Sequence, residues 1–323
     1  MMKRGLYTAI GLVLIAIGCV ALYNMLNEKP EEDFRHEWRF EAGELRDLAI
    51  EGDSRGLNVK YEASGDGTES VSIEGRADGD VVDRIKQAKL RDGRLAIDTD
   101  PESFRIGIFD WGDWNSINDR FTITVKLADP DALEKLEVES DSGGVQIEGL
   151  SASSASVSTE SGSIRMYDFK GERLEVEADS GSIRGERIEA DLAVAAQSGS
   201  VKLQDVKGER LTAKSDSGSI QAERIEAELE VSSDSGSIQI QGLTGKSAIS
   251  SDSGSVRLDK LDDSDADIKT ESGSVKIDLP ASFAGFYDLQ SDSGSIRAPE
   301  SKRETNGYIK VRTDSGSIRV DEK

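Results

Sequence analysis

Apolar and polar residues alternate along most of this chain in short stretches that recur about every nineteen residues. The recurring phrase is an acidic residue followed by Ser-Gly-Ser and then Ile or Val, and ten near-copies lie between Gly143 and Gly316. Consecutive central glycines are 18, 19, 21 or 22 residues apart. A period of this length, held over more than half of a chain, indicates structural units that stack on one another.

The columns of the repeat predict β-strands on both sides of the glycine. After the glycine, the second residue is always Ile or Val, the third is Arg, Lys or Gln, and the fourth is mostly apolar or small. Before the glycine, the fifth residue is apolar and the third is only Ser, Thr or Ala. A further apolar column lies seven residues past the glycine, from Leu150 and Phe169 to Leu243 and Leu261. Alternation with a period of two is typical of strands with one buried face.

We therefore predict an all-β fold, a β-solenoid of about ten regular rungs over residues 131–323, preceded by irregular rungs. Each rung of 18–22 residues should supply about three short strands, and equivalent strands should pair in parallel about 4.8 Å apart. The Ser-Gly pair is interpreted as a corner in which glycine adopts a positive φ. The rungs lengthen at Pro280–Tyr287 and at Ala298–Tyr308.

Residues 45–130 read as an irregular β region that begins the same solenoid. Gly52–Val59 resembles a degenerate copy of the later phrase, and terminal repeats are expected to be atypical because they close the core. The segment Asp80–Leu90 fits either a short helix or another strand.

An aromatic insertion at residues 104–117 interrupts this region. Phe104, Phe109, Trp111 and Trp114 are candidate partner-contact residues, because aromatic loops often form contact surfaces. The alternative is that the insertion folds over an open end of the solenoid and buries its rings.

The N-terminus predicts a membrane anchor. Residues 1–5 form a short basic tail, residues 6–26 carry no charge and are long enough for a transmembrane helix, and residues 27–44 read as a polar linker. Basic residues before the helix and acidic ones after it predict a cytoplasmic N-terminus and an extracytoplasmic bulk, in a single-pass protein of a bacterial cell membrane. A cleaved signal peptide and a lipoprotein attached at Cys19 are the alternatives.

The chain is strongly acidic, with a formal net charge of −23. The residues after the predicted anchor carry 38 basic and 63 acidic side chains, or 38 − 63 = −25. Nucleic acid is therefore excluded as a partner, since phosphate binding requires a cationic surface. An envelope protein or a glycan remains, and the simplest role of the charge is solubility.

Catalytic chemistry has few candidates here. His36 is the only histidine and Cys19 the only cysteine, which excludes histidine-based triads, histidine metal sites and an exported thiol nucleophile. An acidic residue recurs in nine of the ten corners, as turn chemistry requires and as one catalytic centre does not. We predict no catalytic residues and no cofactor, with weak Ca²⁺ binding by the stacked carboxylates as a hypothesis. The basic column five residues further on could instead neutralise these acids.

The combination of a basic tail, one anchor, a degenerate β region and Ser-Gly-Ser-Ile rungs resembles the bacterial putative-adhesin family of unknown function (the DUF4097 type), which includes LiaG-like membrane-anchored proteins. The resemblance covers about residues 45–320, with Asp292–Arg297 and Phe121–Leu127 as the most characteristic segments. It implies a right-handed parallel β-helix that faces outward from the cell. We expect a membrane-anchored, extracytoplasmic, non-catalytic interaction or structural module; a carbohydrate-active β-helix enzyme and a Ca²⁺- or glycan-binding adhesin are the alternatives.

Overall fold

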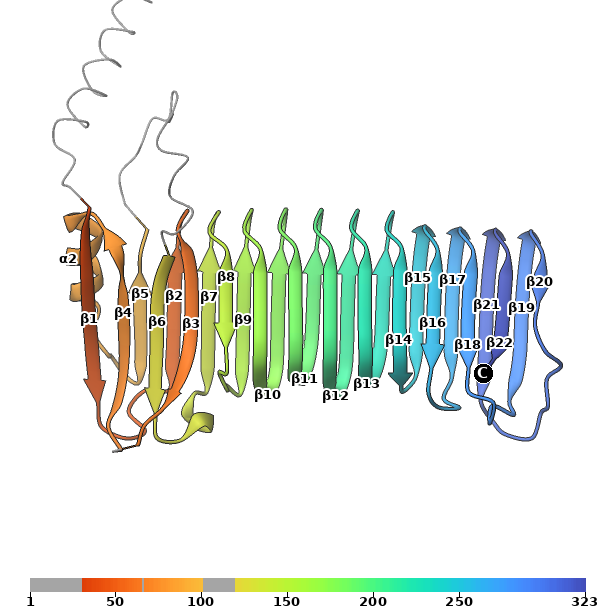
Figure 1. Cartoon of the computed structure of the whole chain (residues 1–323), viewed down its shortest axis with the longest axis horizontal. Helices are drawn as coiled ribbons and strands as arrows, with labels where there is room; N and C mark the ends of the chain where they lie inside the picture. Colours follow the sequence, from red (N-terminus) through yellow and green to blue (C-terminus); the bar gives the residue numbers. More distant parts are fainter. Residues whose placement is uncertain (1–30, 66, 101–119) are drawn as a thin grey trace, which may run out of the picture.

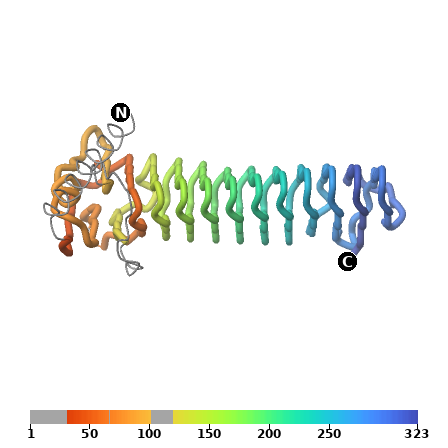
Figure 2. Tube along the Cα trace, turned by 90° about the horizontal axis from the view of Figure 1, so that it is seen from above, coloured from red at the N-terminus to blue at the C-terminus, as the bar shows by residue number. Residues whose placement is uncertain are grey.

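The computed structural model describes residues 31–65, 67–100 and 120–323, which form a long β-solenoid (Figure 1). Strands of successive rungs lie side by side along the rod, with β1 at one end and β19 and β20 at the other. The view from above shows the same regular stack of rungs (Figure 2). The predicted all-β solenoid is thereby confirmed.

Two predicted features fall on other parts of the chain. The membrane helix at residues 6–26 and the candidate contact residues Phe104, Phe109, Trp111 and Trp114 lie outside the described residues. Within the described ranges, no helix has both the length and the apolar character needed to cross a bilayer.

The N-terminal region combines irregular rungs with a cap. Its elements are β1 (Glu32–Phe40), β2 (Asp47–Gly52), β3 (Gly56–Ala63), β4 (Glu69–Ala77), α2 (Gly79–Gln87), β5 (Arg94–Asp98), β6 (Arg120–Leu127) and a 3-10 turn (Pro130–Ala132). β2 and β3 form the degenerate rung predicted at Gly52–Val59, and Leu57 pairs with Val145 of the first regular rung. This rung lies between β5/β6 and β7/β8, because β2 pairs with both β5 and β7 and β3 with both β6 and β8.

The predicted polar linker at residues 27–44 is wrong in part, because β1 occupies Glu32–Phe40. β1 pairs antiparallel with β4, which in turn pairs antiparallel with β6. Alternating Phe34, His36, Trp38 and Phe40 supply the apolar face that the many acidic neighbours obscured in the sequence, and Trp38 is buried. The charged residues that alternate with these side chains lie on the outer, exposed face of this strand.

The segment whose structure the sequence left open is the helix α2. The Asp78 side chain accepts hydrogen bonds from the backbone N–H groups of Asp80 and Val81, both at 3.0 Å, which caps the helix N-terminus. Val81, Val82 and Ile85 are buried on its inner side. Together with β1 and β4, α2 closes this end of the rod.

The regular region runs from β7 to β22. Its strands are β7 (Lys135–Ser140), β8 (Val145–Glu148), β9 (Ser154–Thr159), β10 (Ile164–Ala178), β11 (Ile183–Ala196), β12 (Val201–Ser215), β13 (Ile220–Ser233), β14 (Ile238–Thr244), β15 (Ser247–Ser253), β16 (Val256–Lys260), β17 (Ala266–Ser272), β18 (Val275–Leu279), β19 (Phe286–Ser293), β20 (Ile296–Arg297), β21 (Tyr308–Ser315) and β22 (Ile318–Glu322). All pairings among them are parallel.

Within one rung the strand bends rather than stops. β10 pairs with β11 over Ile164–Tyr167, then over Phe169–Lys170, and after a register shift over Arg173–Ala178. These three segments match the three inward-facing segments predicted per rung. Apart from Ile296 in the terminal rung, the Ile and Val side chains of the columns are almost fully buried inside the solenoid. Burying each such side chain contributes roughly 1.5–3 kcal/mol.

The corner glycines are required for a different reason from the one predicted. None of the ten adopts a positive φ. Instead, each packs against the backbone of the neighbouring rung: a Cβ added to Gly218 would lie 1.9 Å from the carbonyl oxygen of Gly199, and one added to Gly236 would lie 1.8 Å from that of Gly218. Such distances leave no room for a side chain. The column is glycine because stacked backbones touch there.

Small hydroxyl residues complete several corners. Gly218 and Gly236 donate their backbone N–H groups to the buried Oγ atoms of Ser215 and Ser233, each at 2.9 Å. From Gly254 onward the corner differs, since the Gly254 N–H is donated to the carbonyl of Ser272 in the next rung. The buried Ser251 hydroxyl is consequently without a hydrogen-bond partner. The members of this column, including Ala178 and Ala196, share a small size, and most of them are buried at the corner; the hydroxyl bonds the glycine N–H in only some of the rungs.

The last two rungs are stacked in an order opposite to their order in the sequence. β21 lies between β17 and β19, and β22 lies between β18 and β20. The corner glycines agree, because Gly316 packs on Gly273 and Gly294 packs on Gly316. The two longer rungs noted in the sequence contain the connections that skip one rung position and then return to fill it. β19 and β20 therefore form the end of the rod, and the C-terminal rung is held inside.

One predicted core position is wrong. Leu261, the last member of the column seven residues past the glycine, is 60% exposed, whereas Lys260 is buried at 1% exposure and pairs with Leu243 in the neighbouring rung. The Lys260 Nζ donates to the Gly245 carbonyl at 2.6 Å and to the Ser264 Oγ at 2.8 Å. It also lies 3.2 Å from Asp262 Oδ1. These polar partners hold the lysine inward, and the leucine turns out.

Candidate functional site

A column of residues with positive φ forms the bend in the middle of each rung. Six consecutive rungs contribute one residue each to this bend column, all with φ between 54° and 69°: Gly149, Asp168, Arg187, Asp205, Arg224 and Gly242. Residues other than glycine are uncommon in this conformation, and each is generally strained by about 1 kcal/mol or more. Four successive rungs therefore place a charged residue where glycine would be the easier choice. That substitution needs a compensating interaction.

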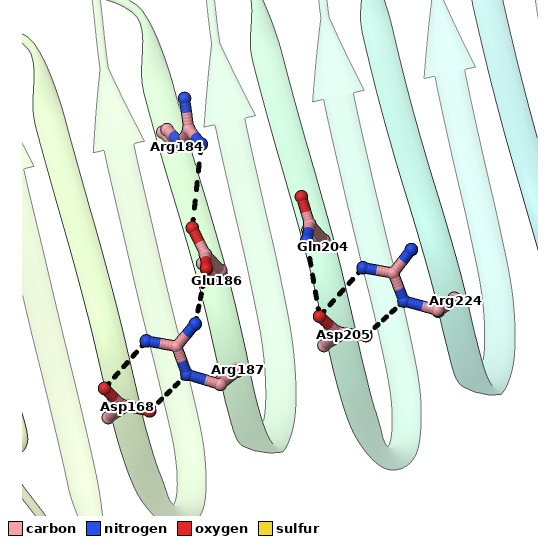
Figure 3. Close-up of polar contacts among 7 residues, drawn as sticks. All are labelled: Asp168, Arg184, Glu186, Arg187, Gln204, Asp205 and Arg224. Atoms are coloured by element: carbon pink, nitrogen blue, oxygen red, sulfur yellow. Dashed lines mark hydrogen bonds and ion pairs between the residues drawn. The ribbon is translucent and has the colours of Figure 1, made fainter.

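The compensation is a pair of bidentate salt bridges between rungs (Figure 3). Arg187 donates through Nε and Nη2 to the two carboxylate oxygens of Asp168, at 2.5 and 2.9 Å. Arg224 makes the same two hydrogen bonds to Asp205 in the next pair of rungs. Glu186 also accepts from Arg187, and Arg184 approaches Glu186 at 3.6 Å. The left-handed backbone turns each of these side chains along the rod toward its partner.

The electrostatics follow from these contacts. The hydrogen bonds from Arg187 lower the pKa of the Asp168 carboxyl, with the nearby positive charge adding to the effect. Hydrogen bonds from Arg224 lower the pKa of Asp205 in the same way. The pKa values of Arg187 and Arg224 are raised by their carboxylate partners. All four groups are thus charged at neutral pH.

A second column runs beside the first with the opposite sequence of charges. Lys170, Glu189, Lys207 and Glu226 pair in register, two residues after the bend in each rung, and Thr244 continues the column. Lys207 Nζ lies 3.8 Å from Glu226. A rung with an acidic bend therefore has a basic neighbour column, and the next rung has the reverse. The two columns form a surface of alternating charge with no net charge, on a strongly acidic protein.

Two grooves flank this second column. The first, of about 780 Å³, lies over the bend column and is lined by both charge columns together with Phe169, Val206, Gly242, Thr244 and the exposed Leu261. The second, of about 890 Å³, lies over the register shift and includes Gly171, Gly208, Arg173 and Asp191. Glu189, Lys207 and Glu226 line both. We refer to the first as the charged groove.

We expect the salt bridges of the bend column to stabilise the folded chain at neutral pH and to lose this effect in acid. The pKa of Asp205 is lower in the folded chain than its ordinary value of 3.8. Its contribution to the free energy of unfolding is therefore fully present above pH 3.8 and is lost as the pH falls through the pKa of the folded chain. Asp205→Asn should therefore lower the thermal midpoint slightly at pH 7, and the difference from the wild type should vanish in strong acid. Thermal unfolding of both chains between pH 7 and pH 2 measures this. Glu228→Gln, at an exposed position away from the bend, should show no such trend.

The sequence carried a signal for this site that the nineteen-residue period hides. The glycine spacing alternates 19, 18, 19, 18 from Gly162 to Gly236, so the real unit is a double rung of 37 residues. Asp-x-Lys-Gly-Glu-Arg occurs at residues 168–173 and again at 205–210, and Arg-Ile-Glu-Ala at 187–190 and again at 224–227. A search for a period twice as long finds the alternating charges directly.

The charged columns singled out from the sequence behave differently from the bend column. The basic residues after the corner pair mainly with acids on their own or a neighbouring strand, as in Arg319 with Asp321 and Arg257 with Asp278. Among the salt bridges of the described residues, none joins this basic column to the acidic corner residues, so the alternative in which the two columns neutralise one another is not observed. In the described part of the chain, no group of three or more His, Cys, Asp or Glu side chains is placed to hold a metal ion. Weak Ca²⁺ binding stays a prediction.

Several solved structures are similar to this chain, although their sequences differ widely from it. No curated protein has a sequence that matches it. Among solved structures, it is similar to a putative adhesin from Bacteroides fragilis (14% identity, 90% of this chain and 97% of that chain, TM-score 0.36) and to a putative lipid binding protein from Parabacteroides distasonis (17%, 89% and 96%, TM-score 0.40). A putative adhesin from Parabacteroides merdae is similar at 11% identity, over 89% and 96% of the two chains, with a TM-score of 0.32.

The family assignment comes from the sequence model. The model of the Toastrack DUF4097 family matches residues 47–191 and again residues 189–322. The two matches meet in β11, in the middle of the regular rungs, and together they span nearly all of the solenoid. The chain is a member of the Toastrack (DUF4097) family.

Proposed function

We propose that this protein is a non-catalytic binding module of the cell envelope, attached to the membrane by its N-terminal segment and extended outward as a rod. The charged groove carries this proposal. Its two alternating columns repeat over four rungs, so the surface is long, shallow and periodic. An extended ligand can make several equivalent contacts along such a surface, whereas a reaction centre needs a few unlike groups at one place.

The chemistry of the groove favours a protein segment that carries both positive and negative side chains. Arg187 and Arg224 are about half exposed, so their remaining donors are available to carboxylates of a partner. Glu189 and Glu226 offer acceptors to basic side chains in the same groove. Leu261 provides an exposed apolar contact at its end. Along either column, a ligand with one sign of charge would meet repulsion at every second rung.

The architecture supports an outward orientation. β1 is at the closed end of the rod, and β19 and β20 are at the opposite end (Figure 1). An anchor that precedes β1 would hold the closed end at the membrane and place the charged groove along the side of the rod, away from the bilayer surface.

Charge reversal in the groove tests the proposal. Full-length chain with Arg187→Glu and Arg224→Glu should lose the envelope partners that a photo-crosslinker at Gln204 captures in cells from the wild type. Reversal at Lys214, which is exposed on the other half of the rung, is the matched control and should leave capture unchanged. Equal capture by the groove variant and the wild type would contradict a binding role for this groove. Circular dichroism of each variant confirms that the β-structure is intact.

A further inference from the structure

The two ends of the rod differ in how their strands are covered. At the N-terminal end, β1, β4 and α2 close the stack with antiparallel strands and a helix. At the other end, β19 pairs only with β21 and β20 only with β22 among the described strands. The outward edges of β19 and β20 thus remain unpaired by any strand in that part of the chain. An unpaired edge is a template for a further strand.

The same end exposes apolar side chains that every other rung buries. Ile296 occupies the column two residues past the corner glycine and is 45% exposed, whereas its counterpart Ile318 is 1% exposed. The difference arises because Ile318 is covered by β20 on one side and β18 on the other, while Ile296 has a neighbour on one side only. Leu289, which pairs with the fully buried Val311, is likewise only partly buried. What is missing is the apolar column of one more rung.

Some of the backbone N–H and C=O groups on the outward edge of β19 are free to pair with another strand. The Phe286 N–H points inward and is donated to the Gly307 carbonyl at 2.8 Å, so alternate residues of β19 point their backbone groups outward. The Tyr287 N–H is donated to the Ser301 Oγ at 3.0 Å, which covers the first outward position. Leu289 and Ser291 follow at the next two outward positions of the strand. The loop that carries Ser301 therefore shields only the beginning of β19.

We propose that this open end pairs with the same end of a second copy of the chain, through antiparallel contact of β19 with β19 about a two-fold axis. Head-to-tail stacking is disfavoured because the other end is closed. Two open ends fit each other, because each has an unpaired strand edge and a partly exposed apolar column. Each supplies the rung that the other needs to cover Ile296. The interface continues, across the two-fold axis, the rung-on-rung packing that builds the rest of the rod.

Charge at the end is compatible with self-association despite the acidic rod. The Asp288 carboxylate is held by Arg312 at 2.5 Å and by the Tyr308 hydroxyl at 2.7 Å. Asp292 and Arg297, one acid and one base, lie on opposite sides of the terminal corner. Two copies related by a two-fold axis therefore bring together an end with nearly balanced charge, and not two like-charged surfaces. This pairing is independent of the charged groove, which lies on the side of the rod.

Disulfide trapping tests the pairing directly in the full-length chain. In a Cys19→Ser background, Asp288→Cys, Gln290→Cys and Asp292→Cys are oxidised singly and in mixed pairs, because the register of the two-fold pair decides which positions face each other. At least one combination should give a disulfide-linked dimer. Gln221→Cys, on an outward position in the middle of the rod, is the matched control and should stay monomeric. No dimer from any combination, or trapping only to a different protein in cells, would overturn the proposal.

The mass of the chain in detergent provides a second test. The wild type should be a concentration-dependent dimer by light scattering after correction for bound detergent. Ile296→Lys places a charge in the contact and should weaken dimerisation at least ~10-fold. Ala248→Lys places the same charge at an exposed position on the side of the rod, outside the charged groove, and should leave the dimer unchanged. A wild type that is monomeric at all concentrations, or equal effects of the two lysines, rejects the end-to-end contact.

Discussion

Gly218→Ala should destabilise the rod strongly, because the added methyl group meets the backbone of the neighbouring rung. The new Cβ would lie 1.9 Å from the Gly199 carbonyl oxygen and 2.6 Å from its carbonyl carbon, both of them backbone atoms that cannot rotate away. Relief requires two rungs to separate, which also lengthens the parallel hydrogen bonds on either side. We expect a loss of at least ~3 kcal/mol, at or beyond the upper end of the usual cost of overpacking. Urea unfolding followed by circular dichroism measures it.

The chain contains a matched control for this change. Gly144 directly follows the first corner glycine, at a position where the other rungs have serine, and a Cβ there would meet only the Ser163 carbonyl at 3.4 Å. Gly144→Ala should therefore be nearly neutral or slightly stabilising. If both alanines had the same effect, chain flexibility and not backbone contact would explain the glycine column.

Lys260→Ala should produce the second large effect. The side chain is fully buried in a column that is otherwise apolar, and its ammonium is shared among Gly245, Asp262 and Ser264. Removing it leaves a cavity and an unpaired carbonyl at Gly245, although Asp262 keeps hydrogen bonds from the Gly245 N–H and the Ser264 hydroxyl. We expect a loss of about 2–4 kcal/mol in the free energy of unfolding. Lys246→Ala, at an exposed lysine of a neighbouring rung, should cost less than about 0.5 kcal/mol.

The pH dependence gives this prediction a second, independent reading. Burial lowers the pKa of Lys260 from its ordinary value of 10.5, against the opposing effect of Asp262. The unfolded chain therefore holds the proton more tightly, and the contribution of this group to stability increases as the pH rises from the folded value toward 10.5. Relative to Lys260→Met, the wild type should gain stability over that range. A relative loss would show that the buried ion pair, not burial, dominates.

The repeat columns illustrate how far local pattern carries. Period-two alternation around Val201 or Ile220 identifies strands, faces and the parallel stack, because each rung buries the same columns against the next. The pattern failed where one side chain contradicted its column. Lys260 and Leu261 stand in an order that predicts leucine inward. The Gly245 carbonyl of the neighbouring rung and the Asp262 carboxylate of the following loop reverse it. Where these partners lie depends on how the rungs stack, which the local pattern does not contain.

The candidate site shows the same division. The residues of the charged groove recur every 37 positions and could have been found from the sequence, and so could the alternation of Asp168 with Arg187. That they face each other depends on the left-handed backbone at the bend, which no feature of those residue types predicts. The strain of that conformation is offset only once the next rung is in place.

The sequence by itself determined the solenoid, its corners and its acidic character, because these depend on residue type and period alone. Tertiary structure decided the rest. It showed that the corner glycines serve backbone contact between rungs, that the terminal rungs are stacked out of sequence order, and that one end of the rod is left open at β19 and β20. Each of these features depends on which rung lies next to which. Because the repeats are nearly identical in sequence, the repeated phrase cannot specify the order in which the rungs stack.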